Sequence, residues 1–331
     1  MNSSEKQTCF CVGEEKVLKS LLILASRNSG HGSNITYVDE CGRVTNLSVC
    51  PERIVSLSPS NTEILFAVGA GDKVVGVTDY CNYPTELEAR IEADEIVRVG
   101  GYWNPLVETI VDLKPDLVLV STAQCTLKTN NCKTNCSRRC ELTVKVANRL
   151  RSLGLNVLIL APHSMNDVLD DILLVGMATG NSAEAINLVE NLRQRIDAVV
   201  TNSNLASNRP KVYFEVWNNP YISVNSGTWI GNLINLAGGT NIFGDAVSEW
   251  PVIRSEDIIQ RDPDIMVFPV IPGVPRFWGS FEAVKKRLGW ENITAVRDGR
   301  LYEVPRDFIS RPGPRLVEAL ELLEKMINPS S

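Results

Sequence analysis

Along the chain from residue 53, short apolar runs alternate with stretches in which apolar residues recur every three or four positions. The short runs are rich in Val, Ile and Leu, as buried strands are, and cover residues 54–57, 74–77, 117–120 and 157–160. The stretches between them have the period of amphipathic helices and cover residues 62–68, 106–113 and 141–153. This alternation is typical of parallel β–α–β units and predicts an α/β fold. Ahead of it, residues 35–38 and 44–49 flank Gly42 and predict a small hairpin.

Beyond Pro162 the pattern changes, because two helical stretches follow each other with no strand between them. They cover residues 166–179 and 183–200. The second has one apolar stripe, made of Ile186, Val189, Leu192, Ile196 and Val199. About 20 helical residues span roughly 30 Å, which is enough to bridge two lobes. A second alternation then begins with an expected strand at 211–216.

One junction between a helix and a strand occurs twice. Lys114-Pro115-Asp116 precedes one long apolar run, and Asp262-Pro263-Asp264 precedes another. Proline ends each helix, and each apolar run suits a strand buried on both faces. The repeat favours two lobes of common design, although such junctions are common in α/β proteins. We therefore predict two Rossmann-like lobes with mostly parallel sheets, joined by a single long backbone helix.

The expected domain boundaries follow from these patterns. Residues 1–33 form an N-terminal leader without an assigned role, and 34–162 form an N-terminal α/β lobe with a cysteine-rich insert at 123–140. Residues 163–208 form a helical connector that includes the backbone helix, and 209–331 form a C-terminal α/β lobe.

The charge balance narrows the classes of function. With 33 Lys and Arg against 39 Asp and Glu, the formal net charge is −6, which argues against a nucleic-acid partner. His31 and His163 are the only histidines, too few for a zinc site of three histidines. No apolar run reaches the roughly 18 residues that a transmembrane helix needs.

No motif in the chain points to catalysis. Gly69-Ala70-Gly71 closes an expected helix and precedes a strand, whereas a phosphate-binding loop follows a strand and opens a helix. These glycines are therefore predicted to end the helix. Because the chain also lacks a Gly-x-Ser-x-Gly elbow, a Walker loop and a His-Glu-x-x-His pair, we expect no enzyme and no cofactor or metal of its own.

The cysteine content indicates an oxidising compartment. Nine cysteines are many for a reducing cytosol, and five Asn-x-Ser/Thr sequons add weak support. We therefore expect an extracytoplasmic protein. The N-terminal residues show no clear signal peptide, since Glu5, Glu14 and Glu15 precede an apolar run of only 21–25.

Aromatic residues follow several expected strands. In an open α/β lobe the loops past the carboxyl ends of the strands form the ligand crevice. The rings expected to bind a large, partly apolar ligand there are Tyr80, Tyr102, Trp103, Trp217, Trp250 and Phe308. Trp229 and Trp290 are instead expected in the core.

The cysteine-rich insert follows the strand that ends at Val120 and therefore lies beside the same crevice. Its four thiols belong to Cys125, Cys132, Cys136 and Cys140. Its cations are Lys128, Lys133, Arg138 and Arg139. We interpret the insert as a basic rim that is held together by two local disulfides. A metal site is the alternative, although the cysteine spacing matches no usual zinc or iron–sulfur cluster signature.

Charged residues in and near these loops have two interpretations. Arg306, Arg311 and Arg315 could grip a carboxylate or phosphate through paired hydrogen bonds, or form ordinary ion pairs on a solvated loop. Glu63 and Glu256 each lie near a helix start, where the helix dipole is a sufficient reason for an acidic residue. One exposed Glu on each lobe could also anchor a basic receptor surface.

Five motifs together resemble one family. They are RIVSLSPSNTEILFAVG at 53–69, VGVTDYCNYP at 75–84, LKPDLVLV at 113–120, GGTNIF at 238–243 and WPVIRSE at 250–256. In this order they resemble the helical-backbone (class III) periplasmic binding proteins of cobalamin and ferric-siderophore ABC importers. The likeness is closest to the cobalamin-binding members and runs from about residue 35 to 326. The cysteine-rich insert is not part of the family pattern.

The resemblance implies a non-enzymatic solute-binding protein that holds a metal chelate, cobalamin or another corrinoid, between its lobes and docks onto an ABC permease dimer. Glu63 and Glu256 match the lobe-tip carboxylates that engage the permease, and Arg311 falls in a ligand-binding loop. The resemblance also implies a monomer that binds no nucleic acid. A ferric-siderophore or haem binder is the alternative within this class. A chelatase-like enzyme that uses the cysteine-rich insert to bind metal is the alternative outside it.

Overall fold

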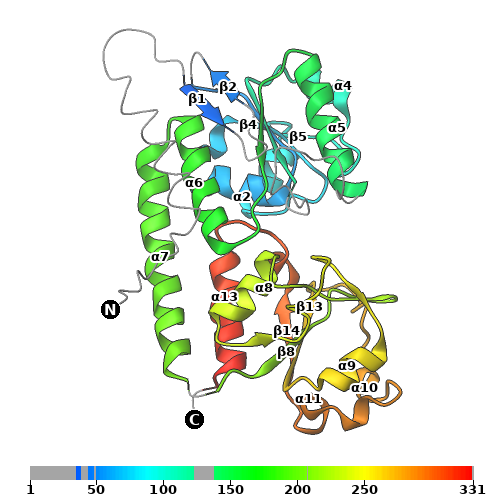
Figure 1. Ribbon diagram of the computed structural model, residues 1–331. Coiled ribbons are helices and arrows are strands. Elements are labelled where there is room, and N and C mark those ends of the chain that lie inside the picture. The colour runs from blue at the N-terminus through cyan, green and yellow to red at the C-terminus, as the bar shows by residue number, and fades with distance from the viewer. Residues whose placement is uncertain (1–34, 39–43, 48–49, 123–137, 207, 330–331) are drawn as a thin grey trace, which may run out of the picture.

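Two separate parallel sheets give the molecule two lobes, which lie one after the other along a long helix (Figure 1). The computed structural model describes residues 35–38, 44–47, 50–122, 138–206 and 208–329. The predicted α/β class and the two-lobed architecture are confirmed.

The N-terminal lobe is built on a five-stranded parallel sheet. In the order in which they pair, its strands are β5 (Val97–Arg98), β4 (Val74–Val77), β3 (Ile54–Ser56), β6 (Leu117–Ser121) and β7 (Val157–Leu160). β3, β6 and β7 are buried at every position, as continuous apolar runs are when helices cover both faces of a sheet. α4 (Val107–Asp112) and α5 (Arg138–Ser152) cover one face. α2 (Pro59–Ala67) and α3 (Glu86–Glu92) lie on the other.

The C-terminal lobe repeats this plan with four parallel strands. They pair in the order β11 (Thr240–Asn241), β8 (Lys211–Phe214), β13 (Ile265–Val270) and β14 (Leu301–Pro305). One face is covered by α8 (Trp229–Leu236) and α13 (Leu316–Ile327). The other is covered by α9 (Ser255–Arg261), α10 (Phe281–Lys285) and α11 (Thr294–Arg297). Trp229 and Trp290 are 3% and 0% exposed, so both were correctly predicted to lie in the core.

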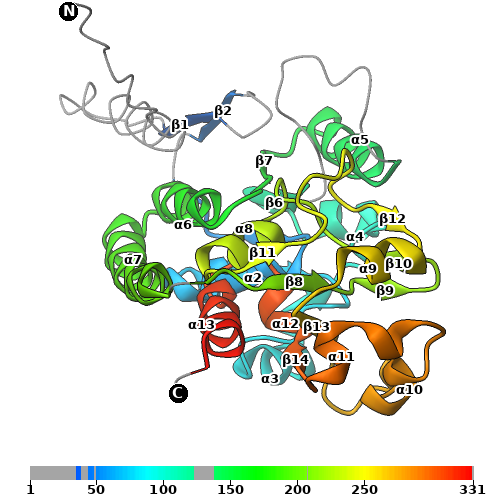
Figure 2. The same cartoon turned by 60° about the horizontal axis from the view of Figure 1, so that its bottom comes forward.

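A small antiparallel sheet extends the C-terminal lobe. Its strands pair in the order β12 (Val252–Ile253), β10 (Tyr221–Ile222) and β9 (Trp217–Asn218). α12 (Arg306–Ile309) follows β14 directly. The predicted hairpin is also present as β1 (Ile35–Val38) paired antiparallel with β2 (Val44–Leu47), and it lies beside α6 (Met165–Thr179), as Figure 2 shows.

The two lobes are connected by α6 (Met165–Thr179) and the 24-residue α7 (Ser182–Leu205), which runs along both of them (Figure 1). The two helices pack so closely that a Cβ on Gly176 would lie 2.2 Å from the Cβ of Ala185. The expected stripe of α7 is wrong at one position, because Ile186 is 46% exposed while Ala185 is buried. Only a small side chain fits opposite Gly176, so at this end of α7 the buried position is Ala185, while Val189, Leu192 and Val199 are buried as predicted. Within the described residues, no helix is both long and apolar enough to cross a bilayer.

The helix–strand junction that occurs twice in the sequence is built the same way in both lobes. Lys114 and Asp262 end their helices with φ of 47° and 44°, in the left-handed region. Two residues later, the Asp116 carboxylate accepts the backbone N–H of Arg53 at 2.9 Å, and the Asp264 carboxylate accepts that of Lys211 at 2.7 Å. Each Asp thus ties the start of its strand to the neighbouring strand, which supports a common design for the lobes.

Candidate functional site

The carboxyl ends of the strands in the two sheets meet between the lobes. Tyr80 follows β4, and Phe308 lies in α12, directly after β14. The loops after these two strands touch, because Asn82 Nδ2 donates to Asp307 Oδ2 at 3.2 Å and Arg311 Nη2 to the Tyr80 carbonyl at 3.4 Å. In open α/β lobes the ligand crevice lies at this edge, so the expected position of the site agrees with the topology.

A buried carboxylate joins the lobes at this contact. Glu63, on α2 of the N-terminal lobe, is only 2% exposed. Its carboxylate accepts Arg315 Nη2 at 2.6 Å and Nε at 2.9 Å, and Arg311 Nη1 at 3.0 Å. The expectation that Glu63 is an exposed docking residue is therefore wrong. The Ser58 side chain caps α2 by accepting the N–H of Asn61, so the helix starts earlier than expected and Glu63 lies in its middle, facing the other lobe.

The two arginines that bind Glu63 are fully engaged with protein partners. Arg311 also donates to Asn82 Oδ1 at 2.7 Å and pairs with Asp307 at 3.1 Å. The Arg315 guanidinium lies 3.9 Å from the ring centre of Tyr83 and 5.1 Å from that of Phe308. Burial opposes the charge of Arg315, but its hydrogen bonds to Glu63 and the negative charge of that carboxylate together outweigh burial and raise the pKa of Arg315. Of the two interpretations of this cluster, the ion pairs are the one observed.

The predicted ligand-binding rings differ in what they present to solvent. Tyr80 is 60% exposed and Trp217 is 45% exposed, so both offer open ring faces. Tyr102 is half-buried, and its hydroxyl donates to the Ser121 carbonyl at 2.7 Å. Burial raises the pKa of Tyr102 to about 12, so the hydroxyl remains a neutral donor.

Three further predicted rings are half-buried. Trp103 lies edge-on to Tyr102, with ring centres 4.3 Å apart. Trp250 lies edge-on to the buried Trp229 at 5.3 Å, and its indole N–H is buried without a hydrogen-bond partner. The ring centre of Phe308 lies 5.1 Å from the Arg315 guanidinium. Contact of these rings with a ligand remains a prediction.

One ring at this edge was missed by the sequence argument. Phe277, in the loop after β13, stacks on Trp217 with ring centres 4.8 Å apart and planes 20° apart. The rule that places Trp217 here applies equally to Phe277, because both follow parallel strands of one sheet. The loop of residues 271–280 has no regular alternation, and this concealed the signal.

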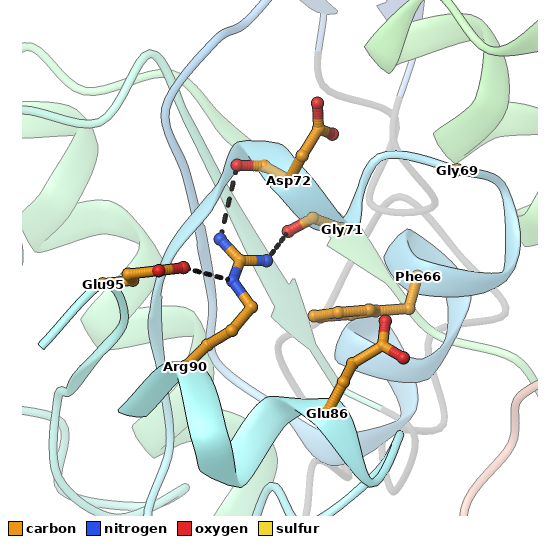
Figure 3. A pocket seen from close by; sticks show the side chains of 7 residues that line it. All are labelled: Phe66, Gly69, Gly71, Asp72, Glu86, Arg90 and Glu95. Atoms are coloured by element: carbon orange, nitrogen blue, oxygen red, sulfur yellow. Dashed lines mark hydrogen bonds and ion pairs between the residues drawn. The ribbon is translucent and has the colours of Figure 1, made fainter. Parts of the chain in front are cut away.

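Two surface pockets lie within single lobes. One, of about 490 Å³, is lined by Phe66, Gly69, Gly71, Asp72, Glu86, Arg90 and Glu95 (Figure 3). Arg90 spans it, donating to Glu95 at 3.0 Å and to the Gly71 carbonyl at 2.6 Å. Gly71 precedes β4 and Glu95 precedes β5, so this pocket lies at the amino edge of the sheet. Gly69, with φ of 80°, follows the last residues of α2, as predicted for a glycine that ends a helix.

The second pocket, of about 500 Å³, contains Glu256. It is lined by Tyr221, Ser255, Glu256, Ile259, Arg287, Leu288 and Gly289. Arg287 pairs with the fully buried Glu215 at 2.5 and 2.9 Å. Burial raises the pKa of Glu215, although Arg287 acts in the opposite direction. Because this pair is neutral overall, Glu256 supplies the pocket's uncompensated charge.

Glu256 is exposed in the first turn of α9, as its docking role requires. Glu108 is exposed in the first turn of α4. Each lies six positions before the left-handed residue of the repeated junction, Asp262 or Lys114. The two lobes therefore present equivalent carboxylates at Glu108 and Glu256.

Most of the cysteine-rich insert lies outside the described residues, including Cys125, Cys132 and Cys136. Cys140 is in α5, but its side chain is not among those described. Cys81 is a buried free thiol whose Sγ lies 3.2 Å from both Thr62 Oγ1 and Thr78 Oγ1, and burial raises its pKa. In the part of the chain that the structure describes, no three potential ligands gather into a metal site.

Comparison with known proteins agrees with this architecture. A family model described as periplasmic binding protein matches residues 54–308. The chain therefore belongs to this family, and its two lobes on a long helix place it in class III. The ABC transporter substrate-binding lipoprotein YvrC of Bacillus subtilis is 31% identical over 301 residues, which cover 90% of this chain and 86% of that protein.

Three of the similar proteins have names that say what those proteins bind. The vitamin B12-binding protein of one Vibrio cholerae strain is 29% identical over 273 residues, covering 82% of this chain and 87% of that protein. The crystal structure of the Vibrio cholerae vitamin B12-binding protein BtuF superposes with a TM-score of 0.65 at 26% identity, covering 84% and 97% of the two chains. The haem-binding protein RhuT of Roseiflexus, at a TM-score of 0.69, 24% identity and coverage of 83% and 97%, shows the same fold. This chain is thus the non-enzymatic substrate-binding component of an ABC transporter and acts outside the cytoplasm on a small-molecule ligand.

Proposed function

We propose that the protein binds a corrinoid, with cobalamin as the first choice, between the facing carboxyl edges of its two lobes. The relatives that bind vitamin B12 support this choice. The observation that carries it is the combination of open aromatic faces with arginines that are already neutralised. Tyr80 and Trp217 expose large ring faces, while Arg311 and Arg315 pair with Glu63.

The charge balance at this edge favours a ligand with few anionic groups. Haem has two propionates, and many ferric siderophores are anionic, so both need free cations to replace their hydration. Arg311 and Arg315 are paired with Glu63, and Arg311 also with Asp307. Arg306 is exposed and keeps one positive charge here, which suits the single phosphodiester of cobalamin. The amide-rich periphery of a corrin needs hydrogen bonds and ring contacts rather than ion pairs.

Calorimetric titration of the full chain with cyanocobalamin, haem and a ferric hydroxamate siderophore tests this proposal. We expect submicromolar binding of cyanocobalamin and at least tenfold weaker binding of the other two. Tyr80→Ala should weaken cobalamin binding, while Leu205→Ala, which removes an exposed apolar side chain at the far end of α7, should not. Binding of haem or the iron chelate in preference to cobalamin would reject the corrinoid and identify the ligand class.

We further propose that Glu108 and Glu256 form the docking pair for the permease. Glu256 was expected in this role, and Glu108 takes the place of the buried Glu63. In right-handed β–α–β units the helix starts at the carboxyl edge of the sheet, so the first turns of α4 and α9 lie on the side of the lobes that holds the ligand. A carboxylate on each lobe there would pair with cations on a symmetric permease dimer.

A further inference from the structure

Trp217 is unusual among the tryptophans of this protein. The chain has six, all within the described residues, and the other five are buried or half-buried. Trp217 remains 45% exposed although its ring is held in place. An immobile ring with an open face is a feature of binding surfaces, because this apolar face is removed from water only when a ligand covers it.

Two neighbouring loops build this ring surface. β8 and β13 are adjacent in the parallel sheet, and the segments that follow them carry Trp217 and Phe277. The rings stack at 4.8 Å with planes 20° apart, close to an offset parallel arrangement. They form one platform rather than two independent contacts.

Hydrogen bonds fix the platform before any ligand binds. Asn218 Nδ2 donates to the Phe277 carbonyl at 2.6 Å and so holds the loop after β13 against Trp217. Trp217 Nε1 donates to the Asn219 carbonyl at 3.0 Å. Since the indole N–H is already bonded, the ring offers a ligand its face and not a hydrogen bond.

We infer that Trp217 and Phe277 form a single ligand subsite that stacks on a flat conjugated part of the bound molecule, with Asn218 as its positioning residue. This inference rests on the proposed function only in that the ligand lies at the carboxyl edges of the lobes. In a corrinoid the flat group is either the corrin ring or the appended aromatic base. The corrin ring and the base present the same chemistry to a stacked ring. Comparing a ligand that has the base with one that lacks it shows which of the two groups is stacked.

The test uses calorimetry on the full chain with cyanocobalamin and with dicyanocobinamide, which lacks the aromatic base. Trp217→Leu and Phe277→Leu should each weaken binding about three- to tenfold, the range expected for one aromatic contact. Because the rings act as a unit, the double variant should lose less than the product of the single losses. If the base is the stacked group, the losses should appear with cyanocobalamin and vanish with dicyanocobinamide; if it is the corrin, both ligands should lose equally.

Asn218→Ala tests the positioning role. It should weaken binding in the wild-type background and have no further effect in the Trp217→Leu background, whereas a merely structural role would add to both. Val274→Ala, on the same loop and 52% exposed, is the matched control and should leave affinity unchanged.

The outcomes separate the subsite from the proposed ligand. If wild type binds haem instead of a corrinoid, the same variants are titrated with haem, whose porphyrin is flat and conjugated, and the same losses are expected. Exclusive binding of the ferric hydroxamate, which has no flat conjugated ring system, would overturn the subsite. Unchanged affinity in both leucine variants would overturn the subsite while leaving the proposed function intact. A wild-type chain that binds none of the three ligand classes would overturn both.

Discussion

Glu63 and Arg315 lie 252 positions apart in the chain and in different lobes, yet Glu63 Oε1 is 2.6 Å from Arg315 Nη2. The Glu63 side chain is 1% exposed and the Arg315 side chain 13%, so both charges are largely removed from water. Two arginines and one carboxylate in such a place require close geometry to offset their desolvation. The contact therefore defines how the carboxyl edge of one lobe lies against the other.

Replacing Glu63 with Gln should destabilise the protein strongly. The substitution keeps the side-chain shape but leaves Arg311 and Arg315 without their shared counter-charge. We expect the free energy of unfolding to fall by about 3 kcal/mol, as when one partner of a buried ion pair is removed. Urea unfolding followed by circular dichroism measures it.

Glu108→Gln is the matched control for this measurement, because Glu108 is an exposed helix carboxylate. It should change stability by no more than about 0.5 kcal/mol. If the Glu63→Gln protein keeps wild-type stability and ligand affinity but loses transport, Glu63 is a docking residue and the structural role is wrong.

Charge reversal at the two equivalent carboxylates should separate docking from ligand binding. In Glu108→Lys/Glu256→Lys, ligand-dependent transport by the reconstituted permease should fall at least about tenfold, because two attractive pairs become repulsive. Ligand affinity, measured by calorimetry, should remain within about twofold, since neither residue is among the predicted ligand-binding residues. Glu92→Lys, an exposed reversal on α3, should leave both quantities unchanged. Transport that survives the double reversal would rule out this docking pair.

The ion pair between the backbone helix and the last helix should make stability depend on pH. Arg195 on α7 donates two hydrogen bonds of 2.8 Å to Glu321 on α13, and these lower the pKa of Glu321 below its ordinary value. A carboxyl with a lowered pKa stabilises the fold above its unfolded pKa of about 4.5, and this stability is lost as the pH falls through the folded value.

Glu321→Gln should therefore reduce the free energy of unfolding by up to about 1 kcal/mol at about pH 7, since the pair is one-third exposed. The difference from wild type should shrink towards zero as the pH falls below the lowered pKa of Glu321. Glu324→Gln on the same helix is the control, because Glu324 forms no ion pair with the described residues. A difference that persists undiminished in acid would mean that packing, not charge, couples the two helices.

Adding one methyl group at the close contact between α6 and α7 should destabilise the protein. Gly176→Ala would place its Cβ 2.2 Å from Ala185 Cβ and 3.0 Å from the Asn181 carbonyl. We expect a loss of about 1–3 kcal/mol in unfolding free energy, as for an overpacked core. The exchange Gly176→Ala/Ala185→Gly keeps the helix propensities balanced and should recover most of it. If the exchange recovers nothing, the carbonyl of Asn181 is the limiting neighbour.

Local sequence signals were sufficient for most elements. Strands β4 and β7 begin and end where their apolar runs do, because every residue of these runs is buried except the half-buried Val75. The helix of α2 extends further back than its apolar period, since the Ser58 cap, and not the periodicity, decides where it begins. The repeated junction was visible as Pro-Asp before each apolar run, and the structure adds its hydrogen bonds to Arg53 and Lys211.

The candidate site was only partly predictable. Positions after parallel strands identified Tyr80 and Trp217, because the carboxyl ends of parallel strands share one edge. Phe277 was missed because its loop has no periodic pattern, and a stacking contact between two loops has no signature in either of them.

The sequence by itself determined the strands, the helices, the long connector and the edge where the ligand is expected, since each depends on residues close together in the chain. Only the tertiary structure decided what the charged residues do. Glu63 and Glu108 are both glutamates in short helices of one lobe, and no local feature tells which is buried. The difference comes from Arg311 and Arg315, some 250 residues away, which reach Glu63 only when the lobes are folded and assembled along α7.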